Sequence, residues 1–288
     1  MGLRCSHFPT LDRFAVTRDG WPVDVRSLTQ CGYYSSPEYL RYVPLGDVSL
    51  EEVDDHLLRS PGEMCCEITD ACNLGCRVCI AEAPAAQPSY LAYNTFANAI
   101  VNAPAAVERV TITGGEPTLH PELLQLLSCC ASTKKCVILS TNGYAPEAAA
   151  RALEVVPIGI LAVSIHGPRA VHDSYVGRVG SYDRALETIR AAQGRCVGVH
   201  VLTVAIRDTL PTVAQLSEDL ASLAIVEHRV SLVKPHGRVA SRAVPYDEAV
   251  AVIHDLQVPH KVSIKRRDQP YEFMSCGGCR EVRRERRY

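Results

Sequence analysis

The chain has 288 residues, of which 47% are apolar and 22% charged, a composition typical of a globular protein with one large core. No apolar run reaches the roughly 18 residues of a membrane helix, because Pro157 and Gly159 interrupt the stretch from 155 to 165. The net charge of −2 disfavours nucleic acid as a partner. Residues 1–9 lack the apolar segment of a secretory signal, so we expect a cytoplasmic protein without a membrane partner.

Residues 1–60 differ in pattern from the rest of the chain and are expected to form an N-terminal extension. Within them, the stretch from 14 to 25 around Asp19-Gly20 predicts a β-hairpin, because Asp-Gly is a favoured hairpin turn. A loop rich in Tyr, Ser and Pro follows it.

From residue 63 the sequence alternates short apolar runs with amphipathic stretches of helical length, which indicates repeated βα units and a parallel sheet. The six predicted strands are 64–69, 107–113, 136–140, 158–165, 197–204 and 226–232. The predicted helices between them are 94–102, 121–131, 146–154, 182–193 and 212–223.

Six units are fewer than the eight of a closed barrel, so we expect an α/β fold of the partial (β/α)6, TIM-like kind over residues 61–240. In such folds the functional groups lie in the loops that follow the strands. Residues 241–288 are expected to form a short C-terminal extension with a helix at 246–256, a strand near 262–265 and a Cys-Gly-Gly-Cys motif.

The chain has thirteen cysteines, and in a reducing compartment these favour metal or cluster ligation over a disulfide framework. Four of them lie in apolar runs and are expected to be buried as small hydrophobic side chains: Cys129, Cys130, Cys136 and Cys196.

Three cysteines follow the first predicted strand directly, in the segment from Thr69 to Cys79. Cys72, Cys76 and Cys79 lie on one loop that can wrap around a compact inorganic centre. Three protein ligands leave one iron of a four-iron cluster open to another ligand, whereas structural zinc requires four ligands. Since Cys65, Cys66 or a distant histidine can supply a fourth ligand, this motif alone leaves both a cluster and zinc open.

Small and polar residues follow each of the next three predicted strands. They are Gly114-Gly115-Glu116, Ser140-Thr141-Asn142 and Ser164-Ile165-His166. Parallel α/β folds bind ligands at the edge of the sheet where these segments are expected to meet. Glycines let the backbone approach a ligand closely, and a carboxylate accepts hydrogen bonds from an ammonium group.

In this order, the three-cysteine loop and the Gly-Gly-Glu segment resemble the radical S-adenosylmethionine (SAM) superfamily, over about residues 63–240. The resemblance implies a [4Fe-4S] cluster on Cys72, Cys76 and Cys79 and SAM bound to its open iron. It implies that Gly114, Gly115 and Glu116 hold the methionine amino group, and that Ser140, Asn142 and Ser164 contact its carboxylate and ribose. It further implies a flavodoxin- or ferredoxin-type electron donor.

The chain departs from this family at Val78, where the family usually has an aromatic residue before the third cysteine; we expect Val78 to pack against the adenine of SAM. The segments 172–185 and 235–240 resemble the subgroup with SPASM- or twitch-type C-terminal extensions. Here that extension is expected to be truncated, because no cysteine follows Cys279. Cys276 and Cys279 therefore form a second iron–sulfur site with another cysteine such as Cys5 or Cys31, bind zinc, or hold no metal.

Tyr175, His166 and His200 are further catalytic candidates, with packing or structural hydrogen bonding as the alternative for each. The resemblance predicts hydrogen abstraction from a peptide substrate of the ribosomally synthesised, modified kind, or from a small metabolite or natural product. A zinc-binding or redox-sensing protein without catalysis is the prediction from a different class.

Overall fold

The computed structural model describes residues 63–265 except 80, 104–106, 108, 196, 234–240 and 255, and three short strands closer to the N-terminus. Those strands are β1 (Arg13–Val16), β2 (Pro22–Val23) and β3 (Arg41–Pro44). β1 pairs antiparallel with both β2 and β3. The predicted hairpin is therefore confirmed, while β3 was not predicted.

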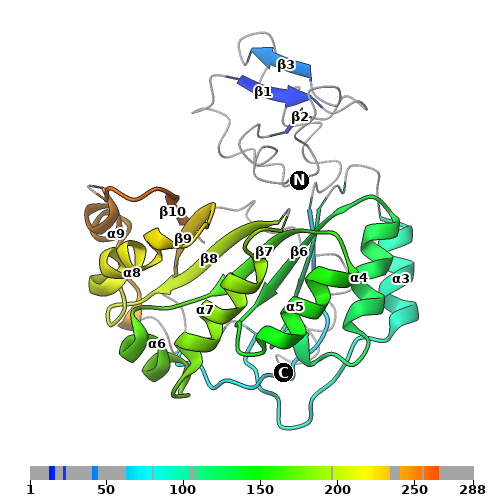
Figure 1. Ribbon diagram of the computed structural model, residues 1–288, viewed down its shortest axis with the longest axis horizontal. Helices are drawn as coiled ribbons and strands as arrows, with labels where there is room; N and C mark the ends of the chain where they lie inside the picture. Colours follow the sequence, from blue (N-terminus) through cyan, green and yellow to red (C-terminus); the bar gives the residue numbers. More distant parts are fainter. Residues whose placement is uncertain are drawn as a thin grey trace.

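A seven-stranded parallel sheet forms the body of the protein, with its strands side by side in the order β10-β9-β8-β7-β6-β5-β4 (Figure 1). Its strands are β4 (Glu63–Glu67), β5 (Arg109–Thr113), β6 (Cys136–Thr141), β7 (Ile158–Ser164), β8 (Gly198–Ala205), β9 (Glu227–Leu232) and β10 (Lys261–Lys265). β4 and β10 are its two edges, so within the described residues the sheet is an open, partial barrel.

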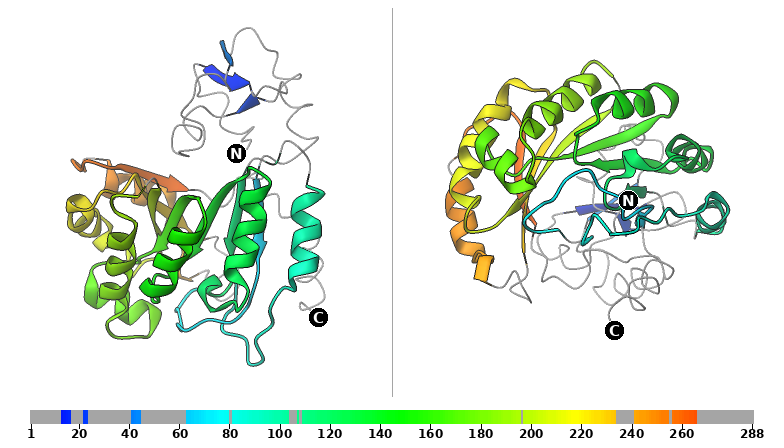
Figure 2. Two further views of the ribbon diagram at one scale, coloured as in Figure 1. Left: turned by 45° about the vertical axis from the view of Figure 1, so that its right-hand side comes forward. Right: turned by 90° about the horizontal axis from the view of Figure 1, so that it is seen from below.

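The helices lie along the outer, convex side of the sheet (Figure 2). They are α3 (Tyr93–Val101), α4 (Leu123–Ser132), α5 (Pro146–Val155), α6 (Arg169–Val176), α7 (Ser181–Ala192), α8 (Val213–Asp219) and α9 (Tyr246–Ile253), with single 3-10 turns η5 (Pro117–Leu119), η6 (Leu210–Thr212) and η7 (Leu220–Ser222). Pro146 begins α5, where a missing N–H costs no helix hydrogen bond.

The main core lies between the sheet and these helices. Leu139 and Val163 point from the sheet into the same apolar cluster as Leu126 of α4 and Ile189 of α7. Because side chains alternate across a strand, the residues between them face the concave side. There, Ile138, Ile160 and Ala162 form a separate small cluster.

The predicted α/β partial barrel is confirmed, and all six predicted strands are present. The sheet has one more strand than predicted, because β10 pairs parallel with β9 and continues the sheet beyond residue 240. Helix α6 was also not predicted. It has only eight residues and ends at Gly177, which has a left-handed backbone conformation.

Three of the four cysteines expected in the core are indeed buried there. Cys129 is 8% exposed, and Cys130 and Cys136 are fully buried. Cys136 is disulfide-bonded, which the sequence did not predict. Cys196 lies outside the described residues, as do Cys276 and Cys279.

Among the helices of the described residues, none has the length and the hydropathy that a membrane span requires.

Candidate active site

The segment of residues 72–79, here called the cysteine loop, follows β4 at the end of the sheet where the strands terminate (Figure 1). Its backbone is bound to the end of α6: the N–H of Gly75 donates to the carbonyl of Val176, and that of Arg77 to the carbonyl of Tyr175, both at 2.9 Å. The last carbonyls of a helix have no partner within the helix, so α6 supplies ready acceptors to the loop.

The three thiols of the cysteine loop lie close enough to affect one another. Burial is the main cause that raises the pKa of Cys76 to about 12, and negative charge on Cys79 and Cys72 contributes to this rise. Burial is also the main cause that raises the pKa of Cys72. The thiols are half-buried and adjacent, so a cationic centre that binds them would favour their deprotonated form.

This grouping does not match a site for one metal ion. Within the described part of the chain, no three His, Cys, Asp or Glu side chains are gathered so that they can hold a single ion. Cys66, one of the predicted fourth zinc ligands, is 3% exposed and belongs to the core on the helix side of the sheet. The three thiols of the loop are donors of the kind that iron–sulfur clusters use, in which each thiolate binds a different iron atom.

Gly114 and Gly115 bring the chain after β5 against the residues that lead into the cysteine loop. The N–H of Gly115 donates to the carbonyl of Thr69, and that of Glu116 to the carbonyl of Ala71, both at 2.7 Å. A Cβ atom at Gly114 would lie 2.2 Å from the Thr69 oxygen, and one at Gly115 would lie 2.2 Å from the Ala71 oxygen. Both positions therefore require glycine for backbone packing.

The carboxylate of Glu116 is fully buried and accepts four hydrogen bonds. The backbone N–H and the hydroxyl of Thr118 donate to Oε1 at 3.0 and 2.6 Å, and the Thr141 hydroxyl donates to the same atom at 2.7 Å. The backbone N–H of Asn142 donates to Oε2 at 2.7 Å. Burial raises the pKa of Glu116, while these bonds lower it. Glu116 therefore joins the end of β5 to the end of β6.

Asn142 continues this connection to the cysteine loop. Its Nδ2 donates to Oδ1 of Asn73 at 2.7 Å and to Sγ of Cys72 at 3.8 Å, while its Oδ1 accepts from the N–H of Tyr144. Ser140 and Ser164 are half-buried at the ends of β6 and β7. They alternate with Leu139 and Val163 of the helix-side core, so their side chains belong to the concave face.

Val78 of the cysteine loop packs against Tyr175 of α6. Val78 is 9% exposed and shares an apolar cluster with Leu74, Tyr175 and Ile206. The Tyr175 hydroxyl donates to the Val78 carbonyl at 3.2 Å, and its side chain is 1% exposed. In this arrangement Tyr175 supports the cysteine loop and is screened from solvent.

The two candidate histidines have different environments. Nδ1 of His166 accepts from the N–H of Val204 at 3.2 Å, and burial lowers the pKa of His166 to about 3, so the ring is neutral. His200 lies near the start of β8, away from the cysteine loop, with Nδ1 3.4 Å from Oε2 of Glu227. Burial lowers the pKa of His200 to about 4.

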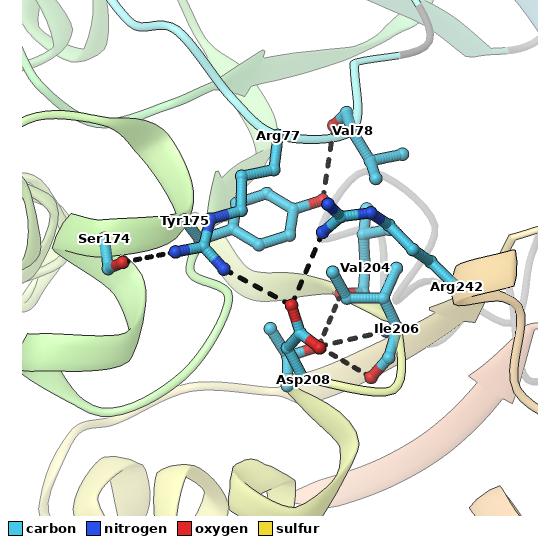
Figure 3. A network of polar contacts seen from close by, with 9 residues as sticks. Arg77, Val78, Ser174, Tyr175, Val204, Ile206, Asp208 and Arg242 are labelled. Carbon is cyan, nitrogen blue, oxygen red and sulfur yellow. Dashed lines mark hydrogen bonds and ion pairs between the residues drawn. The ribbon is translucent and has the colours of Figure 1, made fainter. Parts of the chain in front are cut away.

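A set of polar side chains on the outer side of the loop was missed by sequence reasoning. Figure 3 shows Arg77 between Ser174 and Asp208, at 2.6 and 3.3 Å. Arg178 donates to the carbonyl of Asn73 at 2.8 Å. The sequence indicates the segment 172–185 only as a subgroup feature, whereas its residues Ser174 and Arg178 supply two of these contacts.

Comparison with known proteins identifies the family. The model of the radical SAM superfamily matches residues 66–220, more than half of the chain. The chain belongs to the radical SAM superfamily. Enzymes of this superfamily use a [4Fe-4S] cluster and SAM. The predicted alternative of a non-catalytic zinc or redox protein is therefore wrong.

Among curated radical SAM relatives, the AdoMet-dependent heme synthase of Oleidesulfovibrio alaskensis is 25% identical over 218 residues, which cover 72% of this chain and 56% of that protein. The mycofactocin maturase MftC of Mycobacterium tuberculosis is 32% identical over 180 residues, which cover 60% of this chain and 44% of that protein. The chain thus spans about half the length of these relatives. Streptococcus suis SuiB bound to its precursor peptide SuiA shares the fold, with a TM-score of 0.56, 15% identity, and coverage of 75% of this chain and 53% of SuiB.

Proposed function

We propose that this radical SAM enzyme holds its [4Fe-4S] cluster on Cys72, Cys76 and Cys79 and abstracts a hydrogen atom from a peptide. When bound, the cluster and SAM supply one-electron cleavage to methionine and a 5′-deoxyadenosyl radical. The observation that carries the proposal is the single loop of three adjacent thiols, which is bound to α6 and to Asn142 and directly follows the residues that bind the Gly-Gly-Glu segment.

The backbone of the Gly-Gly-Glu segment, and not its carboxylate, is assigned to the methionine amino group. No hydrogen bond from the described residues reaches the carbonyl oxygens of Gly114 and Gly115, and carbonyls suit an ammonium donor. The Glu116 carboxylate already accepts four hydrogen bonds from residues 118, 141 and 142, so its role is to position the Gly-Gly-Glu segment.

The hydroxyls of Ser140 and Ser164 are assigned to the carboxylate and ribose of SAM, since both belong to the concave face near the strand ends. Asn142 is assigned a positioning role, because its amide is bound to Asn73 and Cys72. Val78 is assigned to the adenine edge of the site, where an aliphatic side chain gives a smaller contact than the aromatic residue usual in the family.

A peptide substrate is supported by the mycofactocin maturase relative and by SuiB, whose fold accommodates a precursor peptide. A small-molecule substrate is the second candidate, and the similarity to heme synthase supports it. Incubation of the reduced enzyme and SAM with a short peptide encoded beside its gene separates the two. A mass change in the peptide supports the first candidate, and an unchanged peptide with turnover of a tetrapyrrole supports the second.

The cofactor assignment is tested by anaerobic reconstitution with iron and sulfide. We expect a brown protein with about four irons per chain, and 5′-deoxyadenosine after addition of dithionite and SAM. Colourless protein that binds stoichiometric zinc and leaves SAM intact would refute the proposal. A second cluster that includes Cys276 and Cys279 would raise the iron content in proportion and would be lost in Cys276→Ala.

A further inference from the structure

The proposed function requires an electron to reach the cluster from outside the protein. We propose that four arginines around the outer side of the cysteine loop dock an acidic one-electron carrier protein such as a flavodoxin. These residues, called the arginine face, are Arg77, Arg178, Arg207 and Arg242. This inference rests on the proposed function, because a carrier has a role here only if the thiols hold a redox cluster.

The location of the arginine face suits electron entry, since transfer between centres slows steeply with distance. Gly75 and Gly177 are both exposed, and a Cβ atom at Gly177 would lie 3.4 Å from the Gly75 carbonyl oxygen. Among the described residues, the outer surface at Gly75 and Gly177 therefore presents glycine backbone, which carries no side chain of its own. A partner protein can approach the loop closely at this point.

The charge of this surface contrasts with the chain as a whole, whose net charge is −2. Asp208 is the carboxylate that pairs with two of the arginines, Arg77 at 3.3 Å and Arg242 at 3.4 Å (Figure 3). Arg207 precedes it and is exposed. The nearby Asp173 carboxylate accepts from the N–H groups of residues 180 and 182 at the start of α7. Positive charge therefore dominates locally.

Two of the arginines, Arg77 and Arg178, are also held in place. Arg77 is fixed between Ser174 and Asp208, and the Arg178 guanidinium lies 4.0 Å from the ring centre of Tyr144 while it donates to Asn73. Side chains that are already ordered lose less entropy on association. Beside them, Val179 is 92% exposed and offers an apolar contact at the same surface.

An acidic carrier is favoured over nucleic acid because the positive charge is confined to a few residues around an exposed part of the loop. Complementary charge raises association rates, and salt screens the effect. The docking surface is therefore expected to act on the rate of reduction and to leave the chemistry of SAM cleavage unchanged.

The test uses Arg207→Glu and Val179→Glu, because neither side chain is assigned to the cluster or to SAM. SAM cleavage is measured twice, with flavodoxin reduced enzymatically and with reduced methyl viologen, a small cation that requires no docking surface. The matched control is Arg151→Glu, an exposed arginine of α5. At low salt we expect each variant to lower kcat/KM for flavodoxin about fivefold, and the control to leave it unchanged.

The difference in kcat/KM for flavodoxin between the wild type and the variants is expected to shrink in ~0.5 M NaCl, where the screening length is only a few ångströms. SAM cleavage driven by methyl viologen is expected to have the wild-type rate in every variant and at both salt concentrations. Equal flavodoxin rates in the wild type and both variants would overturn the proposal, as would a duplex DNA or RNA that binds the wild type and not the variants. If viologen yields no 5′-deoxyadenosine even in the wild type, the proposed function itself fails.

Discussion

Replacement of Glu116 by Gln tests whether the buried carboxylate stabilises the contact between the end of β5 and the end of β6. Gln can keep one oxygen toward the three donors now on Oε1, but its amide nitrogen then faces the N–H of Asn142. One charge-assisted hydrogen bond, worth ~1.5–3 kcal/mol, is lost, and the other three become weaker. We expect the free energy of unfolding to fall by about 3 kcal/mol.

The assay is urea denaturation of the reduced protein at neutral pH, with Glu218→Gln as the matched control. Glu218 is exposed on α8, so its neutralisation is expected to change the free energy of unfolding by less than ~0.5 kcal/mol. SAM affinity is expected to fall in Glu116→Gln, because Asn142 and through it Asn73 lose their fixed position. A Glu116→Gln protein as stable as the control, with unchanged SAM affinity, would refute the positioning role.

Three further changes test neighbouring contacts. Gly115→Ala places a methyl group against backbone and is expected to lower the free energy of unfolding by about 3 kcal/mol or more in urea denaturation. The methyl group of Gly75→Ala meets nothing within 4 Å, so this control is expected to be neutral, and equal losses of stability in the two variants would contradict the packing role of Gly115. Tyr175→Phe is expected to lose about 1 kcal/mol of stability and to keep SAM cleavage and product formation, whereas loss of product with retained cleavage would make Tyr175 a hydrogen donor. His228 is a fully buried residue of β9, and burial lowers its pKa to about 4, so the unfolded chain gains a proton below pH 6.5 that the folded chain does not. Stability is expected to fall by about 2 kcal/mol between pH 7 and pH 5 from this group, and the same pH dependence of stability in His228→Gln would disprove its contribution.

Much of the fold could be predicted because its local signals agree. The runs that form β6, β7 and β8 are largely apolar, and Pro146 marks the start of a helix. β10 was placed outside the barrel because it is short and polar, and only its pairing with β9 joins it to the sheet. Helix α6 was missed because eight residues with charged and polar side chains give a weak periodic signal.

The site was predictable as a set of motifs, but the roles of its members were not. Sequence order placed Cys72 and Glu116 at one edge of the sheet, which the structure bears out. It could not reveal that Glu116 points inward to Asn142, because that depends on the distance between the ends of β5 and β6. The contact between Arg77 and Asp208 joins residues 131 positions apart, which no local pattern indicates.

The most direct test of the central claim is SAM cleavage by Cys76→Ala beside Cys129→Ala, after both have been reconstituted with iron and sulfide. Cys129 is a buried cysteine of α4, outside the cysteine loop. We expect the Cys129 variant to be brown and to release 5′-deoxyadenosine with dithionite, while the Cys76 variant is pale and releases none, since two thiolates cannot hold the cluster firmly. Wild-type yields of 5′-deoxyadenosine from Cys76→Ala would contradict the assignment of the cluster to the cysteine loop.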